Sequence, residues 1–392
     1  MSSLAISGIS ELTTNDPTLG EGRLGRLHDA GIVIDEGRVA WVGPSAKTPP
    51  ADRHVPADGR AVTPGFVDSH THLVFAGERS AEFEARLAGA PYTGGGIAAT
   101  VTATRAASTA ELREHSATLL LAMRRGGTTT VEAKSGYDLT VDGERRLCEV
   151  ASELTEEVTF LGAHVVPDEY AEDRDGYVEL VGGAMLEACR DLVRWVDVFC
   201  ESVAFTVDET RTITERALGV GLGVRLHGNQ LGHSGGVALA AELGAASVDH
   251  CTYLAASDVE ALAGSDTVAT LLPTADLLTR SPPADARALL DAGVTVALAT
   301  DCNPGTSYVT SMGLVLALAV TSLSMTVDEA LWSATRGGAL ALRRPDLGHL
   351  GLGAQGDLVV LEAPRAAHLA YRPGIDLAAL VVKGGTTVAD EE

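Results

Sequence analysis

Eight short β-type runs that alternate with helical segments predict an α/β protein built as a TIM (β/α)8 barrel. The helical segments, such as 110–124, 182–193 and 237–243, have apolar residues at helical spacing. Strands that alternate with helices pair in parallel, and eight such units over roughly 280 residues are the size of one barrel. The runs span residues 62–75, 128–134, 158–166, 195–201, 224–230, 247–253, 267–273 and 294–300.

The two ends of the chain carry a different pattern, with the alternation that is typical of strands. Residues 31–43 near the start have this character, and so do residues 356–361 and 380–384 near the end. Two β-rich ends that flank a barrel can pair with each other. We therefore expect a small β-sandwich domain from residues 1–60 plus 346–392, and a catalytic barrel domain over residues 61–345.

The main alternative to the barrel is a doubly wound open sheet. Such a sheet binds its ligands through a glycine-rich turn after an early strand. No GxGxxG or P-loop motif follows any early run of this chain. The sequence therefore favours the barrel.

Composition restricts the class of protein and its partners. The chain has 392 residues, of which 45% are apolar, so it can build a sizeable core and is not a disordered protein. A net charge of −24 argues against nucleic acid or an anionic membrane surface as a partner. A small anionic substrate would be repelled by this negative net charge, so its binding would need a specific cationic group in the site.

Three features predict a cytoplasmic location. Residues 1–16 lack a basic segment followed by an apolar stretch, so we expect no signal peptide. The most apolar run, around residues 312–320, is too short to span a bilayer, and no membrane partner is expected. Five scattered cysteines without a CxxC pair are typical of reduced thiols rather than of disulfides.

Histidines gather at the ends of the predicted strands, where a barrel carries its chemistry. Five of the eleven histidines occupy such positions, namely His70, His72, His164, His227 and His250, and Asp301 follows the eighth run. Residues i and i+2 of a strand point to one face, so His70 and His72 project together. With His227 and Asp301 they form an N3O set that suits one zinc or iron ion. The open position of such an ion would hold a water that supplies hydroxide as the nucleophile.

Longer motifs resemble those of the amidohydrolase superfamily, and within it those of the imidazolonepropionase family. The superfamily motifs are Pro64-Gly-Phe-Val-Asp-Ser-His-Thr-His72 and Gly356-Asp-Leu-Val-Val-Leu361. The family motifs are residues 72–84, Lys134-Ser-Gly-Tyr137, Phe160-Leu-Gly-Ala-His164 and Asp301-Cys-Asn-Pro-Gly-Thr306. The resemblance runs from about residue 30 to the C-terminus. It implies a homodimer that opens the cyclic amide of 4-imidazolone-5-propanoate to give N-formimino-L-glutamate in histidine degradation.

The resemblance also implies roles for individual side chains. It assigns the metal to His70, His72, His227 and Asp301. It assigns the propionate of the substrate to Arg79, since a guanidinium fork binds a carboxylate bidentately. The other substrate contacts that it implies are Tyr92, Tyr137, His164, Asn303, Gly305 and Thr306.

We expect Asp301 and His250 to carry the proton chemistry. In this hypothesis Asp301 accepts the proton of the attacking water and delivers it to the departing ring nitrogen. The metal or His250 stabilises the developing oxyanion. The sequence leaves open whether His250 transfers protons or only orients, and whether the metal is Zn2+ or Fe2+/Fe3+.

Two positions depart from the family pattern. Gln230 stands where relatives commonly have glutamate, and an amide cannot exchange protons, so we expect Gln230 to orient the substrate. Only Thr93 separates Tyr92 from the next glycines, where many relatives have a longer loop. The fourth run ends at Glu201 without the lysine that bridges two metals in other members, which favours one metal. Glu201 is then either a second ligand or, as we expect, a carboxylate that is hydrogen-bonded beneath the site.

Two other functions stay open at this point. One is a deaminase or deiminase that acts on formimino-glutamate or a heterocycle. Such enzymes generally use glutamate at the position of Gln230, which counts against them. The other is a catalytically inactive relative whose fold serves in assembly. Such proteins have usually lost metal ligands, whereas all four expected ligands are present in this chain.

Overall fold

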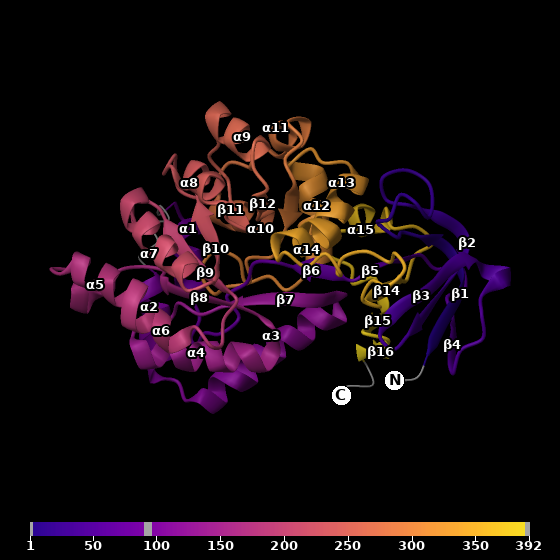
Figure 1. Ribbon diagram of the computed structural model, residues 1–392, viewed down its shortest axis with the longest axis horizontal. Coiled ribbons are helices and arrows are strands. Elements are labelled where there is room, and N and C mark those ends of the chain that lie inside the picture. Colours follow the sequence, from indigo (N-terminus) through magenta and orange to yellow (C-terminus); the bar gives the residue numbers. More distant parts are fainter. Residues whose placement is uncertain (1–2, 90–95, 389–392) are drawn as a thin grey trace. The chain divides into compact units, whose positions relative to one another are not determined.

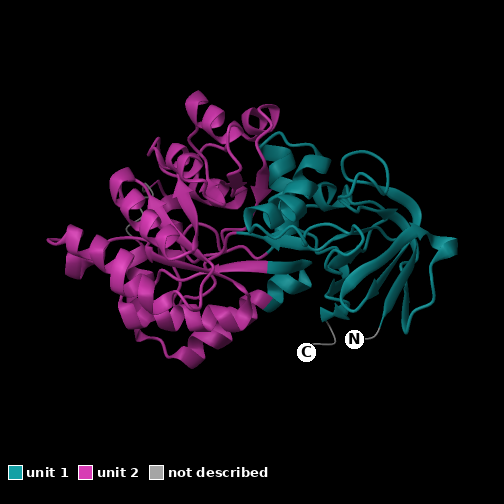
Figure 2. Cartoon of the chain, in the orientation of Figure 1, with its two compact units in different colours: residues 1–69, 121–130, 311–392 teal, residues 70–120, 131–310 magenta. Residues whose placement is uncertain are grey.

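The computed structural model describes residues 3–89 and 96–388 (Figure 1). Tyr92, one of the expected substrate contacts, lies outside the described residues. The chain divides into two compact units, one of residues 1–69, 121–130 and 311–392, the other of residues 70–120 and 131–310 (Figure 2). The domain boundaries expected from the sequence, after residues 60 and 345, stay predictions.

Eight strands succeed one another in chain order around a single sheet, as expected for a TIM barrel. Each successive pair from β7 to β13 is parallel. The strands are β6 (Phe66–Asp68), β7 (Thr128–Lys134), β8 (Glu157–Ala163), β9 (Trp195–Cys200), β10 (Gly223–Gly228), β11 (Ser247–His250), β12 (Val268–Leu271) and β13 (Val296–Leu298). All eight predicted runs therefore contain a barrel strand.

The chain after β6 pairs with the chain after β13 and so brings the first strand next to the last. A parallel bridge joins Thr71 to Cys302. The amide of His72 donates to the carbonyl of Cys302 at 3.0 Å, and the amide of Asp301 donates to the carbonyl of His70 at 3.1 Å. This nearly closed barrel places two predicted metal ligands of the first run beside Asp301.

The helices follow the strands, and Figure 1 shows α4 to α9 on the outside of β8 to β12. Barrel-type crossovers require this arrangement, because the apolar stripe of each helix packs on the sheet. The helices are α1 (Ser80–Leu87), α2 (Ile97–Ala106), α3 (Thr109–Arg125), α4 (Val141–Leu154), α5 (Arg174–Leu180), α6 (Leu186–Cys189), α7 (Val207–Gly219), α8 (Gly236–Leu243), α9 (Ala256–Ala263), α10 (Pro273–Thr279), α11 (Ala286–Asp291), α12 (Met312–Ser322), α13 (Val327–Trp332), α14 (Gly338–Ala341) and α15 (His368–Tyr371). Short 3-10 or π-helical turns span Ser45–Lys47, Asp168–Tyr170, Val181–Met185 and Ser333–Gly337.

A second eight-stranded sheet combines both ends of the chain, which confirms the small β domain expected from the termini. Its strands are β1 (Leu4–Leu12), β2 (Leu27–Asp35), β3 (Arg38–Pro44), β4 (Arg53–Pro56), β5 (Val62–Pro64), β14 (Leu358–Leu361), β15 (Ala378–Lys383) and β16 (Thr386–Thr387). Strand β14 from the C-terminal end pairs with β5 from the N-terminal part. Buried residues of both ends, among them Ile6, Ile32 and Leu358, form one apolar core.

The run expected as the first barrel strand, residues 62–75, is divided between the two sheets. Its first part, β5, belongs to the terminal sheet, and its second part, β6, belongs to the barrel. Gly65 separates them and packs so closely on Thr129 that a Cβ there would lie 2.3 Å from its Oγ1. A single apolar run cannot reveal this division, because buried strands of either sheet have the same composition.

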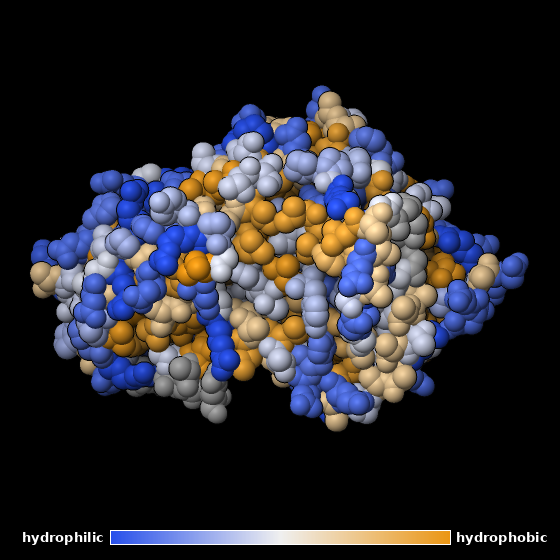
Figure 3. All heavy atoms as spheres, turned by 180° about the vertical axis from the view of Figure 1, so that it is seen from behind, coloured by the Kyte–Doolittle hydropathy of each residue, from blue (hydrophilic) through white to orange (hydrophobic). Residues whose placement is uncertain are grey.

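Within residues 3–89 and 96–388, no helix combines the length and the apolar character that a bilayer crossing needs. On the face drawn in Figure 3, hydrophilic and hydrophobic side chains are interspersed.

Candidate active site

A small cavity of about 30 Å³ opens at the carboxyl ends of the barrel strands. A volume of this size holds about two water molecules. The cavity is lined by His72, Arg79, Ile97, Tyr137, His164, Phe199, His227, Gln230, His250, Asp301, Asn303 and Thr306. Most of the residues singled out from the sequence thus come together on this one cavity.

Three histidines and Asp301 converge beside this cavity. The Oδ1 atom of Asp301 lies 3.4 Å from Nε2 of His70 and 3.6 Å from Nε2 of His72. Nε2 of His72 in turn lies 3.3 Å from Nε2 of His227. Among the described residues, Nε2 of His70 is buried without a hydrogen-bond partner. Three imidazole nitrogens and one carboxylate oxygen that face one another at these distances fit a divalent cation.

Carboxylates lie beside the outer nitrogens of two of these histidines. Nδ1 of His70 lies 2.7 Å from Oδ2 of Asp249, and Nδ1 of His227 lies 3.0 Å from Oδ2 of Asp197. An ionised carboxylate only accepts hydrogen bonds, so the Nδ1 of His70 that donates to Asp249 carries the proton, and its Nε2 presents its lone pair inward. The His70 ring is therefore held in the tautomer that binds a metal, whereas Asp197 lies beside Nδ1 of His227 without a hydrogen bond between the two atoms.

A buried network of charges lies beneath the histidines. Nζ of Lys134 lies 2.8 Å from Glu132 and 2.9 Å from Asp197, and Arg225 lies 3.3 Å from Asp249. Burial alone lowers the pKa of Lys134, but the carboxylates of Asp197 and Glu132 outweigh it and raise that pKa. Burial alone raises the pKa of Asp249, but Arg225 and Lys134 outweigh it and lower that pKa. The network thus keeps the Asp249 carboxylate ionised.

This network was not predicted from the sequence. Its five members are completely buried, and each lies on a barrel strand: Glu132, Lys134, Asp197, Arg225 and Asp249. Charged residues are almost never fully buried unless they are paired. Charges inside otherwise apolar strand runs, such as Asp197 between valines, are the signal that could have revealed them.

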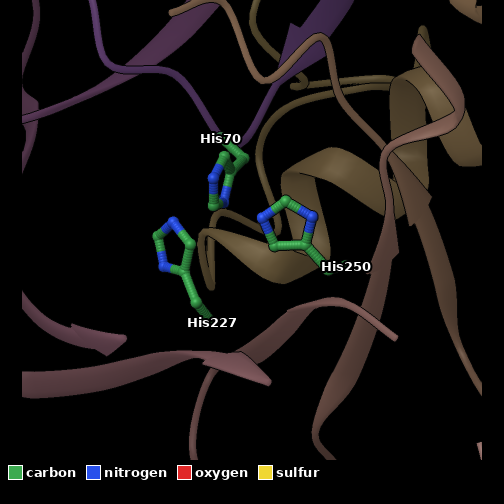
Figure 4. Close-up of side chains that lie close together, drawn as sticks. All are labelled: His70, His227 and His250. Carbon is green, nitrogen blue, oxygen red and sulfur yellow. The ribbon is translucent and has the colours of Figure 1, made fainter. Parts of the chain in front are cut away.

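His250 forms a second group of possible ligands with His70 and His227. The ligand atoms of these three lie within 4.8 Å of one another, as do those of His70, His72 and Asp301. Figure 4 shows the three rings turned toward a common space, and the His70 and His227 ring centres are 4.5 Å apart. Burial holds the pKa of His70, of His72 and of His250 well below the ordinary value. These imidazoles are therefore neutral, as metal ligands must be.

The backbone is strained at the strand ends that carry the residues of this site. Asn229, His250 and Asp301 have positive φ angles of 54°, 79° and 54° at or just after the ends of their strands. Non-glycine residues in this region cost of order 1–3 kcal/mol each and cluster at functional sites. Such strain supports a binding or catalytic use of this end of the barrel.

Residues 301–307, called here the Asp301 loop, fix the second oxygen of Asp301. Thr306 Oγ1 donates to Asp301 Oδ2 at 2.9 Å, and Asn303 Nδ2 donates to Thr306 Oγ1 at 2.7 Å. Asn303 Oδ1 accepts from the amides of Gly305 and Thr306 at 2.7 and 2.8 Å. Burial raises the pKa of the Asp301 carboxyl to about 7. The side chain of Asn303 thus organises the loop as well as lining the cavity.

Arg79 stands between the small cavity and a larger outer one of about 420 Å³, because it lines both. It is 7% exposed and donates from Nε and Nη2 to the two oxygens of Glu82 at 2.7 and 2.8 Å. Gly305, expected as a substrate contact, lines the outer cavity. A side chain at Gly305 would collide with Arg79, since a Cβ there would lie 2.1 Å from Nη1.

The remaining expected contacts surround the cavity from other strands. His164 donates from Nδ1 to the Gly136 carbonyl at 2.9 Å, and burial lowers the pKa of His164 to about 3. Its ring lies 5.1 Å from that of Tyr137 and 5.3 Å from that of His72. A carbonyl only accepts, so Nδ1 of His164 carries the proton and Nε2 is left to accept a hydrogen bond.

Glu201 is a buried carboxylate that supports Gln230. Its Oε1 accepts from the amides of Gln230 and Leu231 at 2.5 and 3.2 Å. The groups of possible metal ligands found among the described residues do not include Glu201. This geometry favours the expectation that Glu201 is hydrogen-bonded beneath the site. Two apolar lining residues, Ile97 and Phe199, were not predicted, because nothing distinguishes them from core residues in the sequence.

Comparisons with known proteins agree on the family. The model of the amidohydrolase family matches residues 61–388. An imidazolonepropionase from Mycolicibacterium smegmatis is 56% identical over 99% of this chain and 98% of its own length. One from Salinispora tropica is 58% identical over 98% of each chain.

Solved structures share the fold at low identity. An atrazine chlorohydrolase from Arthrobacter aurescens complexed with zinc has a TM-score of 0.72 at 20% identity and covers 98% of this chain and 95% of its own. An adenosine deaminase from Xanthomonas campestris with bound zinc has a TM-score of 0.71 at 20% identity and covers 98% of this chain and 92% of its own. These likenesses concern the barrel and its terminal domain.

Proposed function

The chain belongs to the amidohydrolase family and, within it, to the imidazolonepropionases, and on this premise we propose its substrate, its metal and the roles of its site residues. The reaction is the hydrolysis of the cyclic amide of 4-imidazolone-5-propanoate to N-formimino-L-glutamate. Water adds to the ring carbonyl carbon, the ring C–N bond breaks, and a proton goes to the departing nitrogen. The observation that carries the proposal is that Arg79 lines the same cavity as His72, His227 and Asp301.

We assign one metal ion per chain, Zn2+ or Fe2+/Fe3+, to His70, His72, His227 and Asp301. The inward Nε2 atoms and Asp301 Oδ1 support this set, and Asp249 holds the His70 ring in place. When bound, such an ion supplies Lewis acidity and lowers the pKa of a coordinated water. Zinc in two proteins of the same fold supports the choice of metals.

In this proposal Asp301 carries the proton. Its carboxylate is held by Thr306 on one oxygen and faces His70 and His72 with the other. A carboxylate in that position can accept the proton of the attacking water and return it to the ring nitrogen. His250, neutral and on the same cavity, donates a hydrogen bond to the oxygen on which negative charge develops.

The substrate is held by groups at the other side of the cavity. The guanidinium of Arg79 binds the propionate, in agreement with its burial and its fixed orientation on Glu82. Tyr137, His164 and Gln230 contact the ring. The small cavity volume means that these side chains must move apart when the ring enters.

Gln230 bears on the choice between hydrolysis of the lactam and deamination. Its amide side chain can hydrogen-bond a ring N–H or carbonyl but cannot exchange protons. A deaminase would need a proton carrier at this position, so Gln230 favours lactam hydrolysis. Asn303, Gly305 and Thr306 complete the site by shaping the Asp301 loop against Arg79.

We further propose that the enzyme is a cytoplasmic homodimer with small anionic molecules, and not nucleic acid or membranes, as partners. Cys148, Cys189, Cys200 and Cys251 are buried free thiols, which agrees with a reducing compartment. Light scattering of the purified protein tests the dimer.

The decisive experiment is turnover of 4-imidazolone-5-propanoate by the purified holoenzyme, with its metal content measured in parallel. We expect loss of the substrate absorbance, formation of N-formimino-L-glutamate by mass spectrometry, and close to one zinc or iron per chain. No turnover by metal-loaded protein contradicts the proposal. Release of ammonia would instead show the deaminase or deiminase reaction.

A further inference from the structure

Helix α1 contacts the Asp301 loop through two arginines. Arg79 precedes its first turn and Arg86 lies in its last, and they are 7% and 6% exposed. Both reach Gly305: Nη2 of Arg86 donates to its carbonyl at 2.7 Å, and Nη1 of Arg79 occupies the space where a Cβ would lie. The side chains of Arg79 and Arg86 therefore both lie against Gly305.

A continuous run of hydrogen bonds leads from Gly305 to the carboxylate of Asp301. The Gly305 amide donates to Asn303 Oδ1, and Asn303 Nδ2 donates to Thr306 Oγ1, both at 2.7 Å. Thr306 Oγ1 donates to Asp301 Oδ2 at 2.9 Å. The other oxygen of Asp301 faces Nε2 of His70 and of His72. The position of Gly305 is thereby linked to the position of the reacting carboxylate.

Arg86 itself lies away from the reacting groups. It lines the outer cavity, together with Phe83 and Tyr308, and is absent from the residues that line the inner one. A guanidinium that donates to a carbonyl forms a charge-assisted hydrogen bond, which is stronger than a neutral one. The Gly305 backbone is thus anchored by a charge-assisted hydrogen bond from a side chain that does not line the inner cavity.

We propose that Arg86 is a positioning residue for the lactam hydrolysis. By holding the Gly305 carbonyl it keeps the Asp301 loop in the form that aims Asp301 at the histidines. It also preserves the glycine surface on which the Arg79 guanidinium rests. The inference rests on the proposed function, in which Asp301 carries the proton and Arg79 binds the propionate.

The test compares Arg86→Met with Arg86→Lys and with the control Arg113→Met. Arg113 pairs with Glu153 on the surface, where both side chains are about half exposed, so its loss should leave kinetics unchanged. We expect Arg86→Met to raise KM and lower kcat/KM about ten- to a hundredfold, since it removes a hydrogen bond from a charged donor. Arg86→Lys should restore part of the loss because it keeps one charged donor.

A second measurement, the Zn2+ affinity from chelator competition, does not depend on turnover. Arg86→Met should weaken zinc binding, because the hydrogen bonds that start at Arg86 position Asp301, a proposed zinc ligand. Arg113→Met should leave the zinc affinity unchanged. If the wild-type enzyme fails to turn over the substrate, the proposed function fails, and the zinc affinities still decide the role of Arg86. Wild-type KM and wild-type zinc affinity in Arg86→Met would overturn the role.

A double-mutant cycle with Thr306→Val separates positioning from a loss of stability. Two residues of one hydrogen-bonded run have strongly non-additive effects, so the double variant should lose no more than the worse single variant. Additive losses in kcat/KM would overturn the proposal. A lower midpoint of thermal unfolding at unchanged KM in Arg86→Met would do so too, because it would reveal a purely structural role.

Discussion

Nδ1 of His70 lies 2.7 Å from Oδ2 of Asp249, and both side chains are completely buried. The contact fixes the imidazole ring and its tautomer from the side away from the cavity. Carboxylates in this position commonly change metal affinity 10- to 100-fold when they are removed. The pair connects a proposed metal ligand, which follows the first barrel strand, to the sixth strand of the barrel.

Replacement of this carboxylate should weaken metal binding. We expect Asp249→Asn to reduce the Zn2+ affinity by about 10- to 100-fold, because an amide is a weaker acceptor for the His70 Nδ1 proton. Chelator competition on the purified protein measures the affinity. Asp266→Asn, an exposed control, should bind zinc as the wild type does. Equal affinities for Asp249→Asn and the wild type would contradict the orienting role.

Loss of the Lys134 charge should destabilise the fold. Lys134 lies within 3 Å of two carboxylates that are as fully buried as it is. Lys134→Met would leave those charges without their cation, and breaking a buried ion pair costs about 3–5 kcal/mol. Urea unfolding of the metal-free protein measures the free energy of unfolding. Exposed Lys47 provides the matched control, and a change of similar size in Lys47→Met would refute the explanation.

Removal of Arg79 should act mainly on substrate binding. Arg79→Ala deletes a buried guanidinium that, in our proposal, pairs with the propionate, and we expect a loss of about 2–4 kcal/mol, seen chiefly in KM. Steady-state kinetics measure this split. An analogue of the substrate with an uncharged side chain serves as the control, because its KM should respond much less. An unchanged KM for the true substrate would exclude Arg79 as the anchor.

Removal of the Asp301 charge should act on the chemical step. Asp301→Asn keeps the shape of the side chain but cannot accept a proton, so kcat should fall by about two to four orders of magnitude. The assay should be run with the metal content of each sample determined, so that loss of metal and loss of the proton carrier are told apart. A near-normal kcat would remove Asp301 from the proton path.

Asp276 should make stability depend on pH. Burial raises the pKa of this carboxyl to about 6 from an ordinary value of 3.8, against the opposing hydrogen bond from Thr252. Between these two values the folded state binds more protons than the unfolded state, so the free energy of unfolding falls as the pH rises. The loss is nearly complete about one pH unit above the pKa of the folded state and amounts to about 3 kcal/mol at most.

Asp276→Asn tests this dependence, since the amide keeps an acceptor for Thr252 but does not titrate. The free energy of unfolding of the wild type minus that of the variant should decrease from pH 4.5 to pH 7 and stay level above it. A difference that is constant over this range would show that Asp276 has an ordinary pKa.

Much of the architecture could be predicted because it depends on local pattern. Each of the eight predicted β-type runs overlaps one strand of the barrel, and the β-rich ends of the chain form one shared sheet. The run at residues 62–75 was an exception, since its division at Gly65 depends on close packing against Thr129. Sequence periodicity reports which residues are buried, but not which of two sheets buries them.

The candidate site could be predicted as a set of residue types at strand ends. His72, His227, Asp301 and Arg79 do line one cavity, as the barrel geometry requires. The partners of these groups could not be predicted. Arg86 looks like an ordinary helix residue in the sequence, and only the fold brings it to Gly305.

By itself the sequence determined the fold class, the strand ends that carry chemistry and the residue types that can bind a metal and an anion. These follow from spacing along the chain, because i and i+2 share a face and parallel strands end at one rim. Only the tertiary structure decided the pairing of His70 with Asp249, the Lys134 network and the link from Arg86 to Asp301. Such contacts join residues far apart in the chain, and their strength comes from burial, which exists only after folding.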